Sequence, residues 1–380
     1  MTIPAISLSV LIGRVVPTPA PATLLNALDQ IEVTQSDDGR TGFQITFLAG
    51  RGSGLSLDYD LLGWSLVQPF SRIVLVVNLG ALPRVLMDGV ITHQQVLPGE
   101  APGGGRLVVT GEDLSVLMDL QERSIEHPAQ SSELAVLTIL ARYAEYGILP
   151  VIIPSPFVDV PLPIESVPLQ QQTDLQYVRS LAAQVGHVFY VRAGPLPLQS
   201  TAYWGPPIRM GAVQKTLNVN LGPATNVRTI QFAYDALAPT LVQSGFQGLE
   251  LGEALPVDTF ASTRLPPLAV LPALVANMAN VRTVVRSNDG LDEIQAFAQA
   301  QAATDRSVDA VVQASGELDP LRYGDVLSAC DLVGVRGVGW SYDGLYYVKS
   351  VTHTLSRRDY RQQFVLAREG LGSTLPAVPV

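Results

Sequence analysis

The chain has 380 residues, a formal net charge of −10 at pH 7 and only 15% charged residues, with a mean hydropathy of +0.26. A chain of this length is expected to hold two or three domains and to fold without a metal or disulfide. The acidic balance, with lysine only at Lys215 and Lys349, disfavours nucleic-acid binding, and no apolar run approaches the about 20 residues of a membrane span.

The first hundred residues predict β structure. The N-terminal stretch lacks the basic region of a signal peptide, and its serines alternate with apolar residues as in a strand, so we assign no export signal. Residues 30–47, QIEVTQSDDGRTGFQITF, predict a hairpin around an Asp-Asp-Gly turn. A strand in SRIVLVVNLG and a second hairpin at 87–113 follow. Several short antiparallel strands predict a small barrel or sandwich.

The next hundred residues change to an α/β pattern. Residues 111–123 predict a helix with Glu112 and Asp113 in its first turn, where the helix dipole favours anions. Residues 131–147 predict a second helix with a serine cap and a glycine stop. A proline-rich extended stretch covers 150–168.

A third helix is predicted within residues 173–191, TDLQYVRSLAAQVGHVFYV. Thr173 is its expected N-cap, Asp174 lies at the positive helix end, and Gly186 ends the helix before a strand begins. Each polar residue of this segment therefore has a structural role, so we do not assign an active site here.

The remaining chain returns to β structure. Strands are predicted in VQKTLNVNL, NVRTIQFAYD and, from Val308 onward, in three further segments. Between them, residues 236–285 are rich in Pro, Leu and Ala and are predicted to be loosely organised, and GLDEIQAFAQAQAATDR predicts a helix. The tail STLPAVPV is expected to be unstructured. A faint echo links MDGVITHQQV with YDGLYYVKSV, but it is too weak to count as a repeat.

Residue types that carry chemistry are dispersed. Cys330, the one cysteine, excludes an internal disulfide and a Cys-based zinc site, and VLSACDLVG predicts a buried strand with an inert thiol. The histidines at 93, 187 and 353 fall in strand-like contexts that favour structural roles, and His127 precedes a proline in a loop without an obvious ligand companion. The arginines of SRRDYR (356–361) are interpreted as a solvated strand face.

Glycoside hydrolysis needs two carboxylates about 5 to 9.5 Å apart, and the sequence contains four candidate pairs of neighbouring acids. These are Asp37/Asp38, Asp58/Asp60, Glu112/Asp113 and Asp292/Glu293. The first lies in a hairpin turn, the second in a strand or solvated loop, and the last two in helix first turns, where acids are expected anyway. GRGSGLS lacks the context of a nucleophile elbow, and SNDGLDE lacks alternating calcium ligands. We therefore assign no catalytic, cofactor-binding or metal-binding residue.

Three segments in this order resemble one family. They are MDGVITHQQV…GGGRLVVTGEDLSVLMDL, LQQQTDLQYVRSLAAQVGHVFYVRAG and LDPLRYGDVLSA…GLYYVKSVTHTLSRRDYRQQFVLAREG, within residues 85–120, 169–194 and 318–370. They are similar to the end of the first barrel, the α/β domain and the closing β unit of the phage late control D family. That family comprises baseplate hub proteins of contractile tails in phages, tailocins and injection systems, and the hub part of VgrG spikes.

The resemblance implies an α+β, mainly β fold of the tail-hub (VgrG hub-like) type, with two related antiparallel β-barrels and inserted α/β elements. We place the first β-barrel at 1–110, an α/β domain at 111–205, the second β-barrel at 206–236 plus 306–370, an insertion of loop and helix at 237–305, and a flexible tail at 371–380.

The resemblance also implies a structural role and no enzyme. Three chains would form a homotrimer, a ring of six barrels that adapts a hexameric tail tube to a trimeric spike, in contact with baseplate wedge proteins. We expect no cofactor, no nucleic acid and no membrane insertion, and assembly in the cytoplasm as part of a phage tail, tailocin or contractile injection particle. No needle repeat or lysozyme-like domain follows the hub, so the spike is expected to be a separate chain. Residues 236–285 are expected to form trimer or baseplate contacts; the alternative is a loop packed on its own barrel.

Two alternatives belong to other classes. A cell-wall glycoside hydrolase would use Asp58/Asp60 or Glu112/Asp113, and replacing these acids would abolish hydrolysis. A β-rich carbohydrate-binding module would need exposed aromatic platforms, whereas the tryptophans at 64, 204 and 340 are isolated and aromatic residues make up only 7% of the chain.

Overall fold

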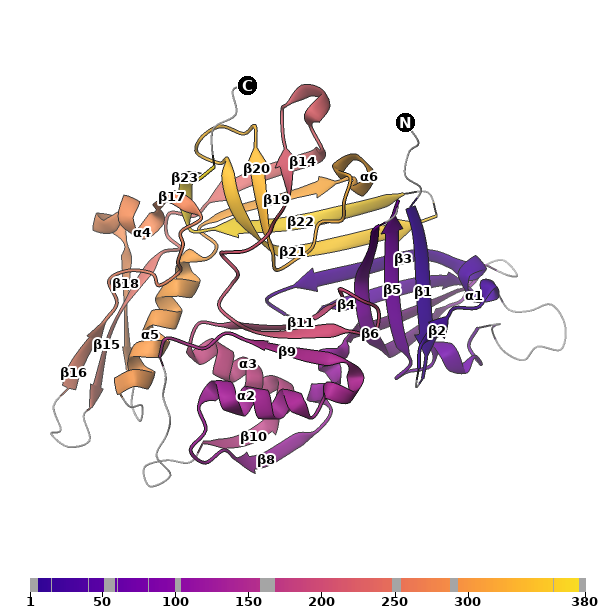
Figure 1. Cartoon of the computed structure of the whole chain (residues 1–380), viewed down its shortest axis with the longest axis horizontal. Helices are drawn as coiled ribbons and strands as arrows, with labels where there is room; N and C mark the ends of the chain where they lie inside the picture. Colours follow the sequence, from indigo (N-terminus) through magenta and orange to yellow (C-terminus); the bar gives the residue numbers. More distant parts are fainter. Residues whose placement is uncertain are drawn as a thin grey trace.

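The computed structural model in Figure 1 describes the chain apart from residues 1–5, 15, 40, 51–58, 60, 81, 100–103, 158–167, 248–253, 288–292, 358 and 376–380. The described chain is mostly β structure, and one sheet of 13 strands organises it. Along its hydrogen-bonded neighbours the sheet runs β14-β19-β22-β21-β3-β4-β7-β6-β5-β1-β2, and β20 and β13 branch from β21.

The N-terminal half of this sheet contains both predicted hairpins, which are confirmed because β3 pairs with β4 and β6 pairs with β7. Apolar residues alternate along β3 and β4, so Ile31, Val33 and Phe43 enter one buried core. The elements are β1 (Ile6–Gly13), β2 (Thr18–Pro19), α1 (Ala22–Ala27), β3 (Leu28–Ser36), β4 (Gly42–Leu48), the 3-10 segment η1 (Ser65–Val67), β5 (Arg72–Leu79), β6 (Leu82–Leu97) and β7 (Arg106–Asp113).

The C-terminal half has a core of its own around Leu217, Tyr346 and Leu366. Its elements are β13 (Val213–Asn218), η4 (Gly222–Ala224), β14 (Val227–Tyr234), β19 (Val312–Leu318), α6 (Pro320–Tyr323), β20 (Leu332–Arg336), β21 (Gly344–Ser356) and β22 (Tyr360–Arg368). β21 pairs with β20 and β22 of its own half and also with β3 of the other half. The expected pair of closed barrels is therefore not seen: among the described strands, the two halves form one open, continuous sheet.

The two halves share one strand topology. In chain order the first half contributes β1, β3, β4, β5, β6 and β7, and the second contributes β13, β14, β19, β20, β21 and β22. Across the sheet, the first half runs β1-β5-β6-β7-β4-β3 and the second half runs β13-β20-β21-β22-β19-β14. Both orders place the six strands of a half in the sequence first, fourth, fifth, sixth, third and second. One difference is that β1 runs antiparallel to β5, whereas β13 runs parallel to β20.

Local irregularities also recur at equivalent places. The β3–β4 ladder shifts register between Leu28 and Gln30, and the β14–β19 ladder shifts between Val227 and Thr229. The β6–β7 ladder shifts between residues 91 and 93, and the β21–β22 ladder between residues 348 and 350. The two halves thus repeat one topology, although the echo between MDGVITHQQV and YDGLYYVKSV was by itself too weak to count as a repeat. The echo had matched the correct strands, β6 and β21, but in the wrong alignment. It makes Gly89 equivalent to Gly344, whereas the register shifts make residue 91 equivalent to residue 348, which differs by two residues.

A left-handed residue marks the same position in each half. Phe70, with φ 67°, donates its backbone N–H to the Ile91 carbonyl at 2.8 Å. Cys330, with φ 65°, donates its own to the Val348 carbonyl at 2.8 Å. A backbone conformation that is uncommon outside glycine thus occurs at equivalent points of both halves, which supports a true internal repeat.

The α/β unit lies below the large sheet in Figure 1 and has a third core, which includes Leu140, Val178 and Trp204. Two predicted helices are confirmed: the Ser131 side chain caps α2 and the Thr173 side chain caps α3. The elements are the 3-10 segment η2 (Leu114–Asp119), β8 (Glu122–Glu126), α2 (Ser132–Ala141), η3 (Ala144–Tyr146), β9 (Ile148–Ile152), β10 (Leu169–Thr173), α3 (Asp174–Gln184), β11 (Val188–Ala193) and β12 (Ser200–Gly205).

The helix predicted at 111–123 is wrong in its start and type. Glu112 and Asp113 end strand β7, where they pair with β4 and β6, and only the short 3-10 segment η2 follows. Two neighbouring strands fix the backbone here more strongly than the local helical pattern does.

Residues 236–285 are more ordered than predicted. They hold β15 (Thr240–Gln247), β16 (Ala254–Asp258), β17 (Ala269–Pro272), α4 (Ala273–Ala276), η5 (Met278–Asn280) and most of β18 (Arg282–Ser287), and α5 (Glu293–Val308) follows as predicted. The tail is also ordered further than expected, since β23 (Gly370–Ser373) pairs with β17. No helix in the described part of the chain is long and apolar enough to cross a membrane.

Candidate functional site

The histidines do not form a site. His127 is buried, with its ring nitrogens 3.3 Å from Gln130 Oε1 and 3.2 Å from Gln170 Oε1, and its ring stacks on Tyr177. His93 lies exposed on β6. Within the described ranges, no group of three or more His, Cys, Asp or Glu side chains is arranged to hold a metal ion.

The other two histidines are buried at separate places. His353 Nδ1 lies 2.9 Å from the Tyr360 hydroxyl, and burial lowers the pKa of His353 to about 3. His187 packs edge-on against Trp204, and burial together with the nearby Arg264 guanidinium lowers its pKa to about 4. Both imidazoles are therefore neutral at physiological pH and take part in packing.

The carboxylate pairs do not converge where the structure describes them. Asp113 is buried and accepts a hydrogen bond from the Ser115 backbone N–H at 2.7 Å; Glu112 precedes it on β7, so the two side chains point to opposite faces. Asp37 is buried, whereas the Asp38 side chain is 80% exposed. The pairs Asp58/Asp60 and Asp292/Glu293, and parts of GRGSGLS and SNDGLDE, include residues outside the described ranges.

Asp174 organises the α/β unit. Its fully buried carboxylate accepts hydrogen bonds from Arg142 at 3.1 Å, the Tyr143 hydroxyl at 2.8 Å and Gln170 Nε2 at 2.7 Å, and Arg123 lies 3.4 Å away. These partners come from the α2 end and from β8 and β10. The structural role predicted for the polar residues of segment 173–191 is thus confirmed for its acid.

The most distinctive feature is the seam, which we define as the seven residue pairs that join β3 to β21. It extends antiparallel from Ser350 opposite Ser36 to Ser356 opposite Gln30. At its centre, the hydroxyls of Thr34 and Thr352 are 3.1 Å apart. The seam joins the two halves through main-chain hydrogen bonds, so it fixes their relative position without specific side-chain chemistry.

Cys330 lies beside the seam, in a turn before β20 and not in the strand that was predicted. Burial raises the pKa of its thiol well above the usual range. The prediction of a buried thiol is confirmed, and such a thiol stays protonated and unreactive.

A cleft of about 470 Å³ opens between the β3–β4 turn, the end of α3 and the residues after α5. Burial raises the pKa of Asp37 to about 6 against the opposing charge of Lys349. Arg179 on α3 donates a hydrogen bond to the Gly39 carbonyl at 2.8 Å. The cleft is a polar junction between units, in which acids and bases neutralise one another.

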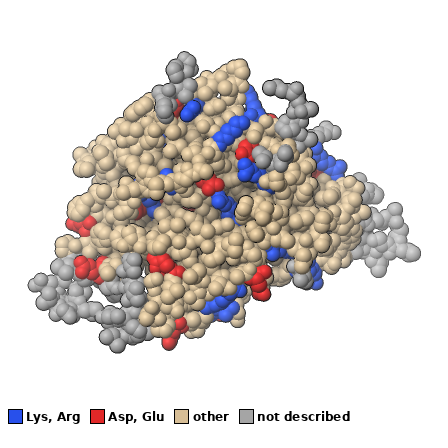
Figure 2. All heavy atoms as spheres, in the orientation of Figure 1, with Lys and Arg blue, Asp and Glu red and all other residues tan. Residues whose placement is uncertain are grey.

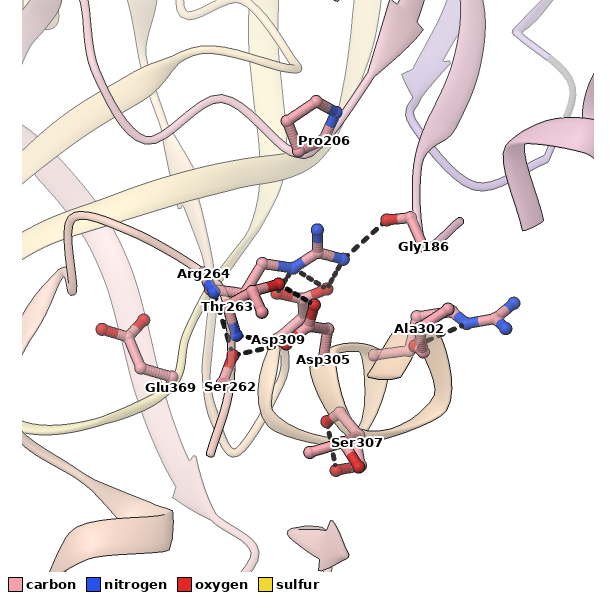
Figure 3. Close-up of polar contacts among 12 residues, drawn as sticks. Gly186, Pro206, Ser262, Thr263, Arg264, Ala302, Asp305, Ser307, Asp309 and Glu369 are labelled. Atoms are coloured by element: carbon pink, nitrogen blue, oxygen red, sulfur yellow. Dashed lines mark hydrogen bonds and ion pairs between the residues drawn. The ribbon is translucent and has the colours of Figure 1, made fainter. Parts of the chain in front are cut away.

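A buried ion-pair network anchors the insertion on this junction (Figure 3). Arg264 donates from Nη2 to Asp309 at 2.8 Å and to the Gly186 carbonyl at 2.8 Å. Arg209 donates to Glu369 at 2.7 Å and to Asp309 at 3.1 Å. These contacts tie the loop before β17 to the α/β unit and to the end of β22.

Two acids complete the anchor by accepting backbone hydrogen bonds. Glu369 accepts from the Leu268 and Ala269 N–H groups, the latter at 3.0 Å. Asp305 on α5 accepts from the Ser262 hydroxyl and the Thr263 N–H, each at 2.7 Å. The segment before β17 is thus held by a carboxylate from α5 and by Glu369, the residue after β22. The sequence does not reveal this pattern because its members are distant along the chain.

The face of the molecule that Figure 2 shows carries few charged side chains. Large apolar side chains stand exposed in the insertion at Leu237 (80%), Phe260 (79%), Leu265 (73%), Val275 (67%), Met278 (67%) and Val285 (79%). Exposed apolar groups in such numbers are typical of a surface that is covered in an assembly. Trp340 is exposed and Trp204 fully buried, so these tryptophans form no aromatic platform.

No protein-family model matches the chain, and no curated protein sequence matches it. Solved structures do match its fold. The tail protein from Neisseria meningitidis MC58 superposes with a TM-score of 0.64 at 13% identity, over 97% of this chain and 98% of that chain. The 43 kDa tail protein of prophage MuSo2 from Shewanella oneidensis gives 0.63 at 12% identity, over 96% and 99%.

A third match is the E. coli c3393 protein, a component of the type VI secretion system with structural similarity to T4 bacteriophage tail proteins. It superposes with a TM-score of 0.56 at 13% identity, over 93% of this chain and 77% of that chain. At these identities the similarity shows the fold. The chain has a mostly β fold that phage tail and type VI secretion proteins share.

Proposed function

We propose that this chain is a structural component of a contractile tail or injection system, and that it serves as the baseplate hub. The observation that carries the proposal is the whole-length similarity in fold to phage tail proteins, which leaves almost no part of either chain unmatched. A shared fold does not fix a function by itself, so the internal features of the chain have to agree with the proposal.

The internal repeat agrees with it. In a hub of this kind each chain supplies two related barrels, at 1–110 and at 206–236 plus 306–370, with the α/β domain at 111–205 between them and the insertion at 237–305. The two sheet halves with one strand topology are the counterparts of these barrels. Three chains would then present six similar units to a hexameric tail tube, and threefold symmetry to a trimeric spike.

The surface and the dispersed chemistry also agree. Exposed apolar side chains in the insertion would be covered by neighbouring chains or by baseplate wedge proteins. A hub needs no catalytic group, and Asp174, His353 and Glu369 are each engaged in hydrogen bonds or ion pairs within the fold. Assembly would take place in the cytoplasm, before the particle is released.

Electron microscopy of the purified chain, with and without its candidate spike protein, tests the proposal. We expect a threefold ring with six similar lobes around a central opening. A chain that stays monomeric even with the spike present would refute the hub. Hydrolysis of cell-wall glycan that is lost in Glu112→Gln would favour the glycosidase instead.

A further inference from the structure

Among the described residues, two strand edges of the internal repeat have no partner strand. The seam occupies the outer edge of β3 and the second part of β21. The equivalent of β3 is β14, and the equivalent of β21 is β6. In the described part of the chain β14 pairs only with β19, and beyond Ile91 no strand pairs with β6 on the side away from β7.

We infer that β14 of one copy pairs with the second part of β6 in a neighbouring copy, and that this ladder repeats the β3–β21 seam between chains. The inference rests on the proposed function, because it supplies the contact by which the ring would close. The contact is a main-chain ladder whose strands, direction and register are set by the seam inside one chain.

The repeat fixes the register of the new ladder. The register shifts make Leu28 equivalent to Val227, and so Thr34 to Ala233. They also make His93 equivalent to Ser350, and so Gln95 to Thr352. Because Thr34 lies opposite Thr352 in the seam, Ala233 of one copy would lie opposite Gln95 of the next.

The free backbone groups of β14 point in the required direction. The Asp235 N–H donates to the Val311 carbonyl at 2.9 Å, so the odd-numbered residues at this end of β14 face β19. The N–H and C=O groups of Ile230, Phe232 and Tyr234 therefore face outward. The same direction occurs in the seam, where the Asp37 N–H donates to the Lys349 carbonyl at 3.3 Å. The odd-numbered residues of β3 therefore point their backbone N–H and C=O groups toward β21. These residues are Ile31, Val33 and Gln35, the equivalents of Ile230, Phe232 and Tyr234.

Burial differs between the two sets in the way that a missing partner predicts. Ile31 and Val33 are 1% and 0% exposed in the seam, whereas their equivalents Ile230 and Phe232 are only half-buried. The other side of the ladder shows the same contrast: His353 is 0% exposed, and its equivalent Val96 is half-buried.

The clearest case is the pair of left-handed residues. Cys330 is 3% exposed beside the occupied seam, whereas Phe70 is 56% exposed beside the free edge of β6. A large aromatic ring at the equivalent of a buried position is expected to be covered when the equivalent contact forms.

The contact is heterologous, since β14 and β6 are different surfaces of the chain. Such contacts extend from copy to copy and either close into a ring or grow into a fibre. An unpaired edge is a site for strand addition, and the outward-facing residues of β14 and Gln94 and Val96 on β6 carry no proline or charge that would block it. Pro98, the equivalent of Leu355, follows the end of β6 and has no N–H to donate, so the new ladder would end at Leu97 and be shorter than the seam. A second copy is the occupant because the seam already shows which strand fits.

A disulfide between chains tests the register. The double variant Gln95→Cys/Ala233→Cys places its two thiols at a non-hydrogen-bonded pair, where Cα atoms approach to about 4.5 Å, within disulfide range. Thr34→Cys/Thr352→Cys is the positive control, because it makes the same pair inside one chain. Gln95→Cys/Gln313→Cys is the matched negative control, because Gln313 is exposed on β19 directly beside Ala233.

Each variant is oxidised mildly and run on a non-reducing gel, and its assembled mass is measured by sedimentation. We expect the Gln95/Ala233 pair to give covalent species of up to three chains, roughly tenfold more than the Gln313 control, since disulfides require Cα distances below about 7 Å. The Thr34/Thr352 pair should give only a faster-migrating single chain. Thermal melting of each variant confirms that it is folded.

Three results would overturn the inference. A trimer by mass without cross-links above the control would reject this ladder and leave the proposed hub intact. Cross-linking between two copies of Gln95→Cys alone, or of Ala233→Cys alone, would indicate a twofold contact instead. A chain that stays monomeric at all concentrations, with and without the spike protein, would reject both the ladder and the hub.

Discussion

Removing the charge of Glu369 tests the anchor of the insertion. In the Arg209–Glu369 pair the side chains are 6% and 4% exposed, and their atoms are 2.7 Å apart. Glu369→Gln keeps the shape and an oxygen for the Ala269 N–H, but it leaves Arg209 with Asp309 as its one remaining acidic partner. Removing one member of a buried ion pair costs about 3–5 kcal/mol, because the other charge stays out of water without compensation.

The assay is urea unfolding, followed by near-ultraviolet circular dichroism and by tryptophan fluorescence. Asp325→Asn is the matched control: its partner Arg84 lies 2.9 Å away, but the side chains are 46% and 29% exposed. An exposed pair contributes only about 0–1 kcal/mol. The double variant Arg209→Met/Glu369→Gln should recover part of the loss, because it also removes the charge that was left unpaired.

The reasoning fails if Glu369→Gln costs no more than Asp325→Asn. It also fails if the double variant loses at least as much stability as the two single variants added together, because additive losses would show that the two residues do not act as a pair.

Asp113 and Phe70 give two further predictions. Burial raises the pKa of Asp113 from 3.8 to about 6, so the folded chain holds this proton more tightly than the unfolded chain, and stability should fall as pH rises from about 4 to above 6. Asp113→Asn keeps the hydrogen bond from Ser115 but cannot ionise, so it should remove a fall in the free energy of unfolding on the order of 3 kcal/mol between pH 4 and pH 8. Urea unfolding at the two pH values measures this fall. A variant with the same pH dependence as the wild type would contradict the prediction. Phe70→Ser should change the stability of the single chain by less than about 0.5 kcal/mol, because the phenyl group is exposed in the single chain. It should nevertheless weaken assembly of the trimer, measured by sedimentation, because a neighbouring chain would cover this phenyl group. Equal assembly of Phe70→Ser and wild type would contradict the buried role of this residue.

Local sequence patterns predicted the elements whose signals lie within a few residues. The Asp-Asp-Gly turn between two alternating strands gave the β3–β4 hairpin, and Ser131 and Thr173 marked the starts of α2 and α3. These features depend on turn geometry and capping, which neighbouring residues control.

Other elements could not be predicted because their partners are far apart in the chain. β15 pairs with β18 from Thr240 opposite Arg282 onward, so the order of residues 236–285 depends on a long-range parallel ladder. Glu112 and Asp113 have a helical pattern, yet the hydrogen bonds of two neighbouring strands hold them in β7. The buried anchor joins Arg209, Arg264 and Glu369, which no sequence motif connects.

The sequence by itself determined the class of the protein: an apolar, acidic, mainly β chain with locally signalled hairpins and helix caps and a resemblance to tail hubs. The tertiary structure decided that the two halves of the sheet share one strand topology, and which of their edges have no partner strand within the described residues. The physical reason is that strand pairing is made by backbone groups common to all residues, so the repeat survives in ladders and register shifts after the side chains have diverged.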